Sequence, residues 1–593
     1  MTTPLRGADV AASLAAWLDA VRRAGGLQPT ATEVVALDQA LGRLTAEPIR
    51  AGRSAPGFDA AAMDGYALTA ASTADAPVVL AEGRFRHVDT GDPLPPAADA
   101  VAKREDVVVD GGLRLARPVP PYTNVRQVGE DVAAGELLFA AGRPLRPADL
   151  AVLGSVGETT VRVRRRPHVV IVPTGDELVP LGTEPGDGQV VDTNSLMLAA
   201  MVEEAGGVAI RAPIVADDPE RLAAALAAAA AEGDLVLLLS GSAGGAGDHA
   251  VSVMEGLGRV VARGVAIKPG HPVVLAHCGP VPVMGVPGYP VSAALAFELL
   301  GVPLLAELSG QTVTPRARVR ATATVELRST PASDEWIRLR LARLGTGLVA
   351  TQLRRGAGVL SSLARADGLT CVPIGASRVA GGEEIEVELL RPLGEIERTL
   401  VVSGSTDPLV DELTARFDLL ADCDGSTNGA ASLAAGRCHL ALVAQVDVPP
   451  AAAVIATRER TLGLVVAPEN PLAIEGVEAF GRPDVRLVNR QPGSASRRLL
   501  DEILAARSID PAAVTGYHRE ARSHAAAVAA VAAGVADCAV GSLSACSGQP
   551  VELIPLVTQT LVLAAAGGLA DDARLTVLRA VLGKGSPPAP VLE

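Results

Sequence analysis

The chain has 593 residues, too many for one hydrophobic core, so its length predicts three or more domains. Hydrophobic residues make up 49% and charged residues 20%, a balance typical of globular proteins. Lys and Arg total 52 against 67 Asp and Glu, and the formal charge of -15 argues against general binding of nucleic acid or anionic membranes. An anionic substrate therefore has to be held by local donors.

The cysteines and the start of the chain bear on the compartment. No two of the six cysteines have the short spacing of a zinc or redox motif, so we expect buried thiols in a reducing compartment. The Ala-rich start contains Asp9 and Asp19 and lacks signal-peptide architecture. The longest uncharged apolar run, near Leu222–Ala231, is too short to span a bilayer. These features predict a cytoplasmic protein with no membrane or nucleic-acid partner.

The first third of the chain changes character twice. Residues 1–50 are expected to form helices separated by turns. Residues 51–131 are rich in Gly, Pro and Asp with short Val-rich runs, which predicts a small β domain. Residues 132–165 contain several glycines that indicate turns, and they end in a strand whose residues alternate in polarity.

Residues 166–311 alternate between strands and helices. Helices are expected from Asp192–Asn194 to Glu204, over 218–231 and over 291–308, with strands at 168–173, 212–215, 235–239 and 281–286. This alternation specifies a doubly wound, mostly parallel sheet. Such sheets bind ligands beyond the carboxyl ends of their strands, which here carry Thr174–Glu177, Ser240–Asp248 and Pro287–Pro290.

The remaining sequence predicts two further domains. Residues 312–393 contain β-rich runs that fit a small barrel, and a linker follows around Arg391–Arg398. Residues 399–593 form a second α/β unit, with strands expected near 399–402, 440–443, 463–467, 485–488 and 553–556.

Several loops combine acidic residues with glycine. Carboxylates on such loops, with a few Lys or Arg nearby, suit Mg²⁺ placed against phosphate oxygens, and no Cys/His cluster favours zinc. Glycine also lets backbone amides approach an oxyanion. Each signal alone is weak, because Asp-Gly pairs are usually turns. The loops are Phe58–Tyr66, Thr90–Pro95, Asn124–Asp131, Thr174–Leu178, Asp217–Asp218, Lys268–Gly270 and Pro287–Pro290.

In this order, together with Asp192–Ser195, these motifs resemble the molybdopterin molybdenumtransferases, the family of bacterial MoeA and the gephyrin E domain. The resemblance covers residues 1–393 and implies a MogA-like pterin-binding domain at 166–311 with flanking small β domains. It implies a homodimer in which residues 1–50 and 132–165 form the dimerisation region. The implied activity is that of a molybdotransferase, which inserts molybdenum from molybdate into adenylylated molybdopterin with Mg²⁺ and releases AMP. A molybdopterin adenylyltransferase is then an expected partner.

The resemblance also assigns residues to roles. Acidic catalytic residues are expected at Asp59, Asp131, Glu177, Asp217 and Asp248, of which Glu177, Asp217 and Asp248 are the expected metal ligands. Cofactor binding is expected at Thr90, Arg126, Gly241, Ser242, Lys268, Pro287, Pro290, Arg338 and Ser361, or its neighbour Ser362.

The sequence departs from the family pattern at three places. Ala60 and Ala61 replace the usual Asn-Ser, and His271 replaces a Lys, which weakens one phosphate contact at neutral pH. The loop 240–248 has a Ser-Ala-Gly form. The acidic set is retained, so we expect activity. The alternatives are a non-catalytic molybdate- or pterin-binding regulator and a scaffold protein.

Residues 399–593 resemble type II periplasmic-binding-protein-like domains appended to some molybdopterin enzymes. The matching segments are 403–405, 424–427, 463–471, 488–501 and 516–517 leading to His524. Hydroxyls and amides at a helix start predict an anion site for molybdate, tungstate or a pterin phosphate. An equally weighted alternative is that Ser494 caps a helix while Arg490, Arg497 and Arg498 are solvated. The expected anion ligands are Ser405, Ser426, Thr427, Gly493, Ser494 and Arg497.

Overall fold

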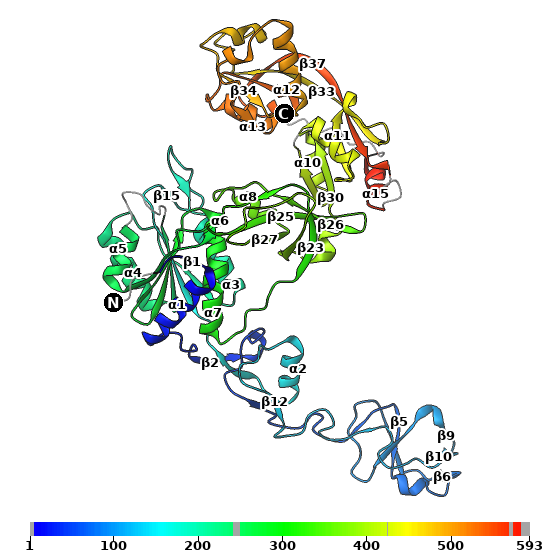
Figure 1. Ribbon diagram of the computed structural model, residues 1–593. Helices are drawn as coiled ribbons and strands as arrows, with labels where there is room; N and C mark the ends of the chain where they lie inside the picture. The colour runs from blue at the N-terminus through cyan, green and yellow to red at the C-terminus, as the bar shows by residue number, and fades with distance from the viewer. Residues whose placement is uncertain (1–4, 241–248, 424, 568–572, 583–593) are drawn as a thin grey trace. The chain divides into compact units, whose positions relative to one another are not determined.

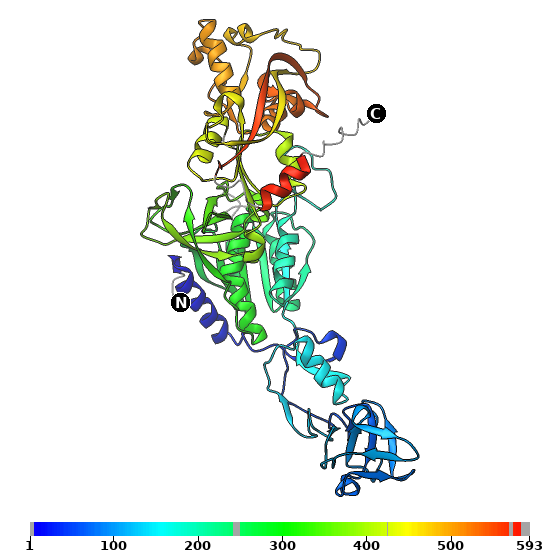
Figure 2. The same ribbon diagram turned by 90° about the vertical axis from the view of Figure 1, so that its right-hand side faces the viewer.

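The computed structural model describes residues 5–240, 249–423, 425–567 and 573–582. The chain divides into two compact units, Met1–Thr314 and Pro315–Glu593. Figures 1 and 2 show the elements of each unit in two views.

The first unit is built around a seven-stranded, mostly parallel sheet. Its central strands, residues 168–173, 235–240 and 281–287, are nearly continuous apolar runs, as expected for strands buried on both faces. The doubly wound α/β fold predicted from the sequence is confirmed. The strand order is β1 (Leu5–Ala8), β19 (Arg259–Val265), β21 (Val274–Cys278), β22 (Val281–Pro287), β18 (Leu235–Ser240), β14 (His168–Pro173) and β17 (Val208–Arg211).

Helices cover both faces of this sheet (Figure 1). One face packs against α1 (Val10–Arg23), α3 (Asn194–Glu204) and the helical run Pro290–Ser309, and the other against α4 (Pro219–Glu232) and α5 (His249–Leu257). The run Pro290–Ser309 is long and apolar enough to cross a membrane by composition, but 67% of it is buried within this unit. It therefore has the character of a core helix.

Three features of this sheet differ from the sequence-based expectation. Strand β1 pairs with β19, and Trp17 of α1 donates from Nε1 to the carbonyl of Ala276 at 2.7 Å, so the chain start belongs to the α/β layer. Strand β17 ends at Arg211, before the expected range 212–215, because Pro213 has no N–H for the ladder. Strands β19 and β21 pair antiparallel and were not expected.

Short strands make up the rest of the first unit. In residues 30–50 and 132–165, β2 (Thr32–Ala36) pairs with β13 (Thr160–Arg164), next to α2 (Pro147–Ser155). Between these segments lies a small β domain in which β5 (Gly65–Leu68) pairs with both β7 (Phe85–Val88) and β8 (Ala100–Lys103). Two further antiparallel pairs join β3 (Ile49–Arg50) to β12 (Leu137–Phe139) and β4 (Ala60–Ala61) to β11 (Val125–Arg126). A separate three-stranded sheet contains β6 (Val78–Leu80), β10 (Leu113–Leu115) and β9 (Val107–Val109).

The second unit begins with a small barrel. Its sheet closes because β27 pairs with β25 as well as with β29. Helix α8 (Leu360–Ala364) lies between β26 and β27 in the chain. The strands, in sheet order, are β25 (Asp334–Leu344), β26 (Gly347–Gln352), β23 (Arg318–Ala323), β29 (Glu384–Leu389) and β27 (Gly368–Val372).

The C-terminal domain has two lobes joined by two long strands. Strands β33 (Ala453–Val466) and β37 (Glu552–Ala565) have 14 residues each and pair antiparallel along their length (Figure 1). Lobe 1 contains β30 (Leu400–Gly404), β31 (Leu419–Asp422), β32 (Leu440–Ala444) and α11 (Ser426–Ala434). Lobe 2 contains β34 (Leu487–Arg490), β35 (Glu520–Ala521), β36 (Cys538–Ser542), α12 (Ala495–Ala506) and α13 (His524–Ala532).

Buried ion pairs fasten the barrel to lobe 1. Asp367 is fully buried and accepts from Arg340 Nε at 2.7 Å and from Arg391 Nη1 at 2.8 Å. The same two arginines donate to Asp418 at 3.1 and 2.8 Å. Each of these buried cations thus has a carboxylate partner.

Candidate functional site

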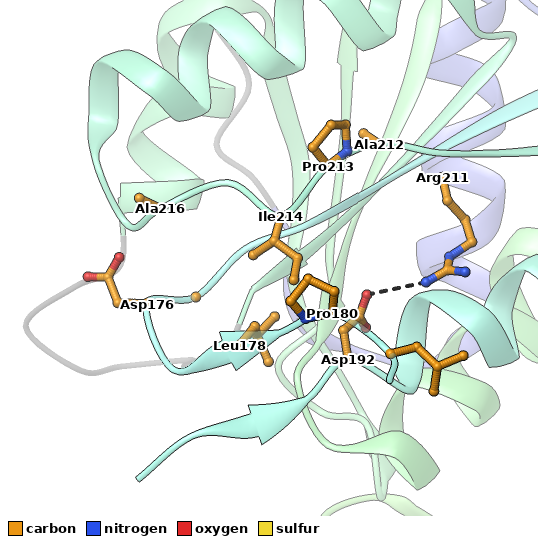
Figure 3. Close-up of a pocket in the computed structure, with 11 residues that line it drawn as sticks. Asp176, Leu178, Pro180, Asp192, Arg211, Ala212, Pro213, Ile214 and Ala216 are labelled. Atoms are coloured by element: carbon orange, nitrogen blue, oxygen red, sulfur yellow. Dashed lines mark ion pairs between the residues drawn. The ribbon is translucent and has the colours of Figure 1, made fainter. Parts of the chain in front are cut away.

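A pocket of about 520 Å³ opens at the carboxyl ends of β14 and β17, where a doubly wound sheet binds its ligands. Segments from 175–181 and 211–216 line it, with Asp192 on one side (Figure 3). Gly175 has φ +146°, and a Cβ there would lie 2.6 Å from Glu177 Oε2. The glycine therefore lets the Glu177 carboxylate fold back over the strand end.

Three carboxylates gather beside this pocket. Asp176 Oδ1 accepts from the backbone N–H of Asp217 at 3.2 Å. Burial raises the pKa of Asp217, and the negative charges of Asp176 and Glu177 raise it further, while His249 opposes them. The structure therefore brings Glu177 and Asp217 together, as predicted, and adds Asp176, which the sequence analysis left out of the site.

A buried polar group supports the other side of the pocket. Asp192 accepts hydrogen bonds from the backbone N–H and the hydroxyl of Ser195, at the start of α3. Arg211 Nη2 lies 3.9 Å from Asp192, the pair drawn in Figure 3, and its Nε donates to Ser195 Oγ at 3.0 Å. The motif Asp192–Ser195 thus holds the pocket wall in place.

The predicted pterin-side loops meet at the start of helix α6 (Pro290–Ala296). Asn194 Nδ2 donates to the carbonyl of Gly288 at 2.6 Å. A Cβ at Gly270 would lie 3.4 Å from the carbonyl of Ser292, so the loop after Lys268 lies against the same helix. Lys268 is exposed and Pro287 is buried at the end of β22, while Pro290 opens the helix.

A second group of predicted residues lies in the small β domain. Asp59 Oδ1 accepts from the N–H of Val128 at 2.8 Å. Thr90 donates from its N–H and its hydroxyl to Asp64 Oδ1, both at 2.8 Å, and these bonds lower the pKa of Asp64. Arg126 lies 3.6 Å from Glu130, and the backbone N–H of Asp131 donates to Ala55 at 3.2 Å. Three neighbouring loops therefore carry Asp59, Thr90, Arg126 and Asp131.

The barrel supplies a third group. Arg338 is 6% exposed and donates from Nη2 to the carbonyls of Arg354 and Gly356 at 3.1 and 3.4 Å. Its Nε has no partner, and burial lowers its pKa. Ser361 is exposed on α8, whereas Ser362 is buried and donates to the carbonyl of Val359.

The predicted metal site is described only in part. Gly241, Ser242 and Asp248 lie outside the described residues, so their predicted roles stay predictions. Over residues 5–240, 249–423, 425–567 and 573–582, no three His, Cys, Asp or Glu side chains are arranged to hold a metal ion. Sequence reasoning also missed Asp64 and His249 as neighbours of the predicted groups, although Asp64 lay within a quoted motif.

Most residues expected to bind an anion in the C-terminal domain have hydrogen-bond partners within the domain, and their role as ligands stays a prediction. Ser494 accepts from the N–H of Arg497 at 3.2 Å and caps α12. The guanidinium of Arg497 lies 4.1 Å from the ring centre of Tyr517 and donates to Asp501. The other four expected ligands are Ser405, Ser426, Thr427 and Gly493. Ser426 Oγ accepts from the N–H of Ala444 and donates to Asp447, and Arg498 Nη1 lies 3.5 Å from Thr427 Oγ1. Gly493 has φ +84°, and Ser405 is buried.

Comparison with protein families accounts for nearly the whole chain. Residues 9–157 match the MoeA N-terminal region (domains I and II), and residues 170–307 match a probable molybdopterin binding domain. Residues 320–390 match the MoeA C-terminal region (domain IV), and residues 410–583 match a periplasmic-binding-protein superfamily domain.

Individual relatives agree with these matches. Molybdopterin molybdenumtransferase 1 of Mycobacterium tuberculosis is 31% identical over 406 residues, 61% of this chain and 95% of that protein. A putative molybdopterin biosynthesis protein of Methanocaldococcus jannaschii is 32% identical over 60% of this chain and 91% of its own length. The crystal structure of a molybdopterin biosynthesis MoeA protein from Pyrococcus horikoshii superposes with a TM-score of 0.56 at 32% identity, covering 65% of this chain and all of that one.

Proposed function

The chain belongs to the molybdopterin molybdenumtransferase family, enzymes of molybdenum cofactor biosynthesis, and on that basis we propose the reaction it performs. It transfers molybdenum from molybdate to adenylylated molybdopterin and releases AMP. The observation that carries this proposal is the group of carboxylates Asp176, Glu177 and Asp217 at the pocket of the pterin-binding domain.

These carboxylates fit a Mg²⁺ ion. Burial and the negative charges of Asp176 and Glu177 raise the pKa of Asp217, and a bound divalent cation would oppose both effects. Hard oxygen ligands are those Mg²⁺ prefers, and the ion usually keeps several waters, so few protein ligands suffice. Glu177 and Asp217 would hold it, with Asp248 as a third ligand. When bound, the ion would neutralise phosphate oxygens and polarise the phosphate.

The chain's own residues bind and orient the rest of the substrate. The exposed Lys268 places a cation against the phosphate, and the loop at Gly288, held by Asn194, shapes the pterin side of the pocket. The ion pair of Arg211 with Asp192 keeps the pocket wall fixed. These groups position the substrate before any bond changes.

We propose that the protein acts as a homodimer in the cytoplasm. Asp59, Thr90, Arg126 and Asp131 lie on neighbouring loops of the small β domain, which would complete the site of a second copy. In the described parts of the chain the cysteines form no disulfide, which is consistent with a reducing compartment. The adenylylated substrate would come from a molybdopterin adenylyltransferase.

Single-turnover release of AMP tests the proposed reaction. Purified protein is mixed with adenylylated molybdopterin, with and without molybdate and Mg²⁺. The proposal requires AMP release that depends on Mg²⁺ and rises with molybdate. An absence of AMP release with every oxyanion tested would leave only the binding-protein alternative.

A further inference from the structure

Four polar side-chain atoms of the C-terminal domain are buried without a hydrogen-bond partner: Thr406 Oγ1, Arg460 Nε, Arg490 Nη1 and His524 Nδ1. Folded proteins pair nearly all of their buried polar groups, because each unpaired group loses its hydration without compensation. Four such atoms in one domain therefore point to a missing partner.

The four residues come from both lobes and from the strands between them. Thr406 follows β30 in lobe 1, and Arg460 lies in the middle of β33. Arg490 ends β34, and His524 begins α13, both in lobe 2. Arg460 Nη1 donates to the carbonyl of Thr406 at 3.1 Å, and Arg490 and Arg460 each lower the pKa of His524. The four residues thus face one region at the junction of the lobes.

This region carries positive charge that no described residue neutralises through an ion pair. Arg460 and Arg490 are 5% and 2% exposed. Their recorded acceptors are neutral: the carbonyl of Thr406 and Gln559 for Arg460, and Gln491 and the carbonyls of 521 and 522 for Arg490. No ion pair involves either guanidinium in the parts of the chain that the structure describes.

The pKa values reflect this imbalance. Burial lowers the pKa of Arg460 to about 10, with only the charge of Asp407 opposing it. Burial and the charge of Arg460 lower the pKa of Arg490 to about 10, and burial keeps His524 neutral by lowering its pKa well below the usual value. Both arginines remain charged at neutral pH, so two like charges are buried close together.

The barrel junction of the same unit shows the usual solution. Arg340 is nearly as buried as Arg460, yet it pairs with Asp367 and Asp418. A buried charge is normally retained only with such a partner. At the lobe junction no described residue supplies such a partner, and a bound anion would supply it.

We propose that Thr406, Arg460, Arg490 and His524 bind a small tetrahedral oxyanion between the two lobes of the C-terminal domain. Two guanidiniums, one hydroxyl and one imidazole N–H then donate to it, and the start of α13 adds a favourable dipole. This site consists of other residues than the anion site expected from the sequence, which stays a prediction. Because the four atoms are buried, the anion enters when the lobes part at β33 and β37.

Calorimetric titration of the full chain tests this site. Molybdate, sulfate and inorganic phosphate are titrated separately at constant ionic strength, which removes the general stabilising effect of kosmotropic salts. The pterin pocket also takes up oxyanions under the proposed function, so variants are needed to assign the heat. Arg460→Gln and Arg490→Gln remove one buried donor each. Arg486→Gln removes an exposed arginine next to β34 that pairs with Asp537, and serves as the matched control.

We expect wild-type protein to bind one of the three oxyanions with submillimolar affinity. Arg460→Gln and Arg490→Gln each weaken that binding about tenfold or more, since each loses a charge-assisted hydrogen bond. Arg486→Gln leaves it within about twofold, as expected for an exposed ion pair. AMP release is unchanged in all three variants, which separates this site from the catalytic pocket.

Unfolding without ligand supplies a readout that a purely structural role would not give. Removal of an unbalanced buried charge leaves the melting temperature of Arg490→Gln unchanged or raises it, while the added stabilisation by the oxyanion is lost. If a variant fails to fold, Thr406→Val replaces it, because valine keeps the shape and removes only the hydroxyl. The proposal is overturned if no oxyanion binds to the wild type, or if Arg490→Gln or Thr406→Val binds as tightly as the wild type.

Discussion

The two α/β domains of this chain gather charges of opposite sign at their candidate ligand sites. In the pterin-binding domain, Asp176, Glu177 and Asp217 crowd negative charge at the strand ends. In the C-terminal domain, Arg460 and Arg490 bury positive charge at the lobe junction. Each group is unfavourable alone and is relieved by a ligand of opposite charge. The comparison teaches that an uncompensated charge cluster indicates the sign of the missing ligand.

The largest expected effect is on catalysis. Asp217→Ala should lower single-turnover AMP release at least about 100-fold, because a carboxylate that holds the cation supplies several kcal/mol of charge stabilisation. Quenched-flow measurement of AMP checks this. Glu232→Ala, at the exposed end of α4, is the control and should release AMP at the wild-type rate. If both variants released AMP at the same rate, Asp217 would have no role in the reaction and the proposed metal site would be wrong.

The next effect compares the stability cost of changing a buried charge that has an ion-pair partner with that of changing a buried charge that has none. Asp367→Ala should lower the free energy of unfolding by about 3 kcal/mol, since it removes the buried one of the two carboxylates that Arg340 and Arg391 share and leaves them only Asp418. Arg490→Gln should change the same free energy by less than about 1 kcal/mol, because no ion pair is lost. Urea denaturation of both variants measures the difference. A large loss in Arg490→Gln would mean that its charge is balanced within the chain.

A smaller effect distinguishes the anion site predicted from the sequence, which includes Ser494, from the site proposed at Arg460 and Arg490. Ser494→Ala should lower the free energy of unfolding by about 1 kcal/mol, the usual cost of losing a helix N-cap. It should leave oxyanion affinity unchanged, since Ser494 already bonds to Arg497 and Gln491. Chemical denaturation and titration of one preparation give both values. Lost affinity in this variant would favour the sequence-based site.

The smallest effect is a dependence of stability on acid. Burial acts to raise the pKa of Asp149, but hydrogen bonds from Arg146 and Arg143 outweigh it and lower that pKa to about 2. A lowered pKa means that the stabilisation is fully present above about pH 4 and is lost as the pH falls toward 2. Thermal melts from pH 6 to 2.5 should show a smaller acid-induced decrease for Asp149→Asn than for the wild type. Parallel curves would contradict the assignment.

Much of the pterin-binding domain was predictable because the patterns that specify its strands and loops lie within short stretches of sequence. Apolar runs marked β14, β18 and β22, and acid-glycine loops at their ends located Glu177 and Asp217. The antiparallel strands β19 and β21 were missed, although β21 pairs with its neighbours in the sequence, β19 and β22. The role of Asp176 became evident only from its hydrogen bond to residue 217.

The C-terminal site was not predictable in the same way. Of the two long strands β33 and β37, only residues 463–467 and 553–556 were expected as strand, because the central part of β33 around Arg460 is polar. Arg490 was weighed as a solvated residue, yet it is 2% exposed, because β35 and β36 flank the strand that it ends. Burial of a charge is decided by packing between distant segments, which a single sequence does not record.

The carboxylate group of the pterin-binding domain is tested most directly by locating a divalent cation. Crystals grown with Mn²⁺ in place of Mg²⁺ give an anomalous signal at the metal. The account predicts a peak about 2 Å from the carboxylate oxygens of Glu177 and Asp217, the distance of a small hard cation. A fully occupied Mn²⁺ elsewhere, with no peak between these two residues, would contradict it.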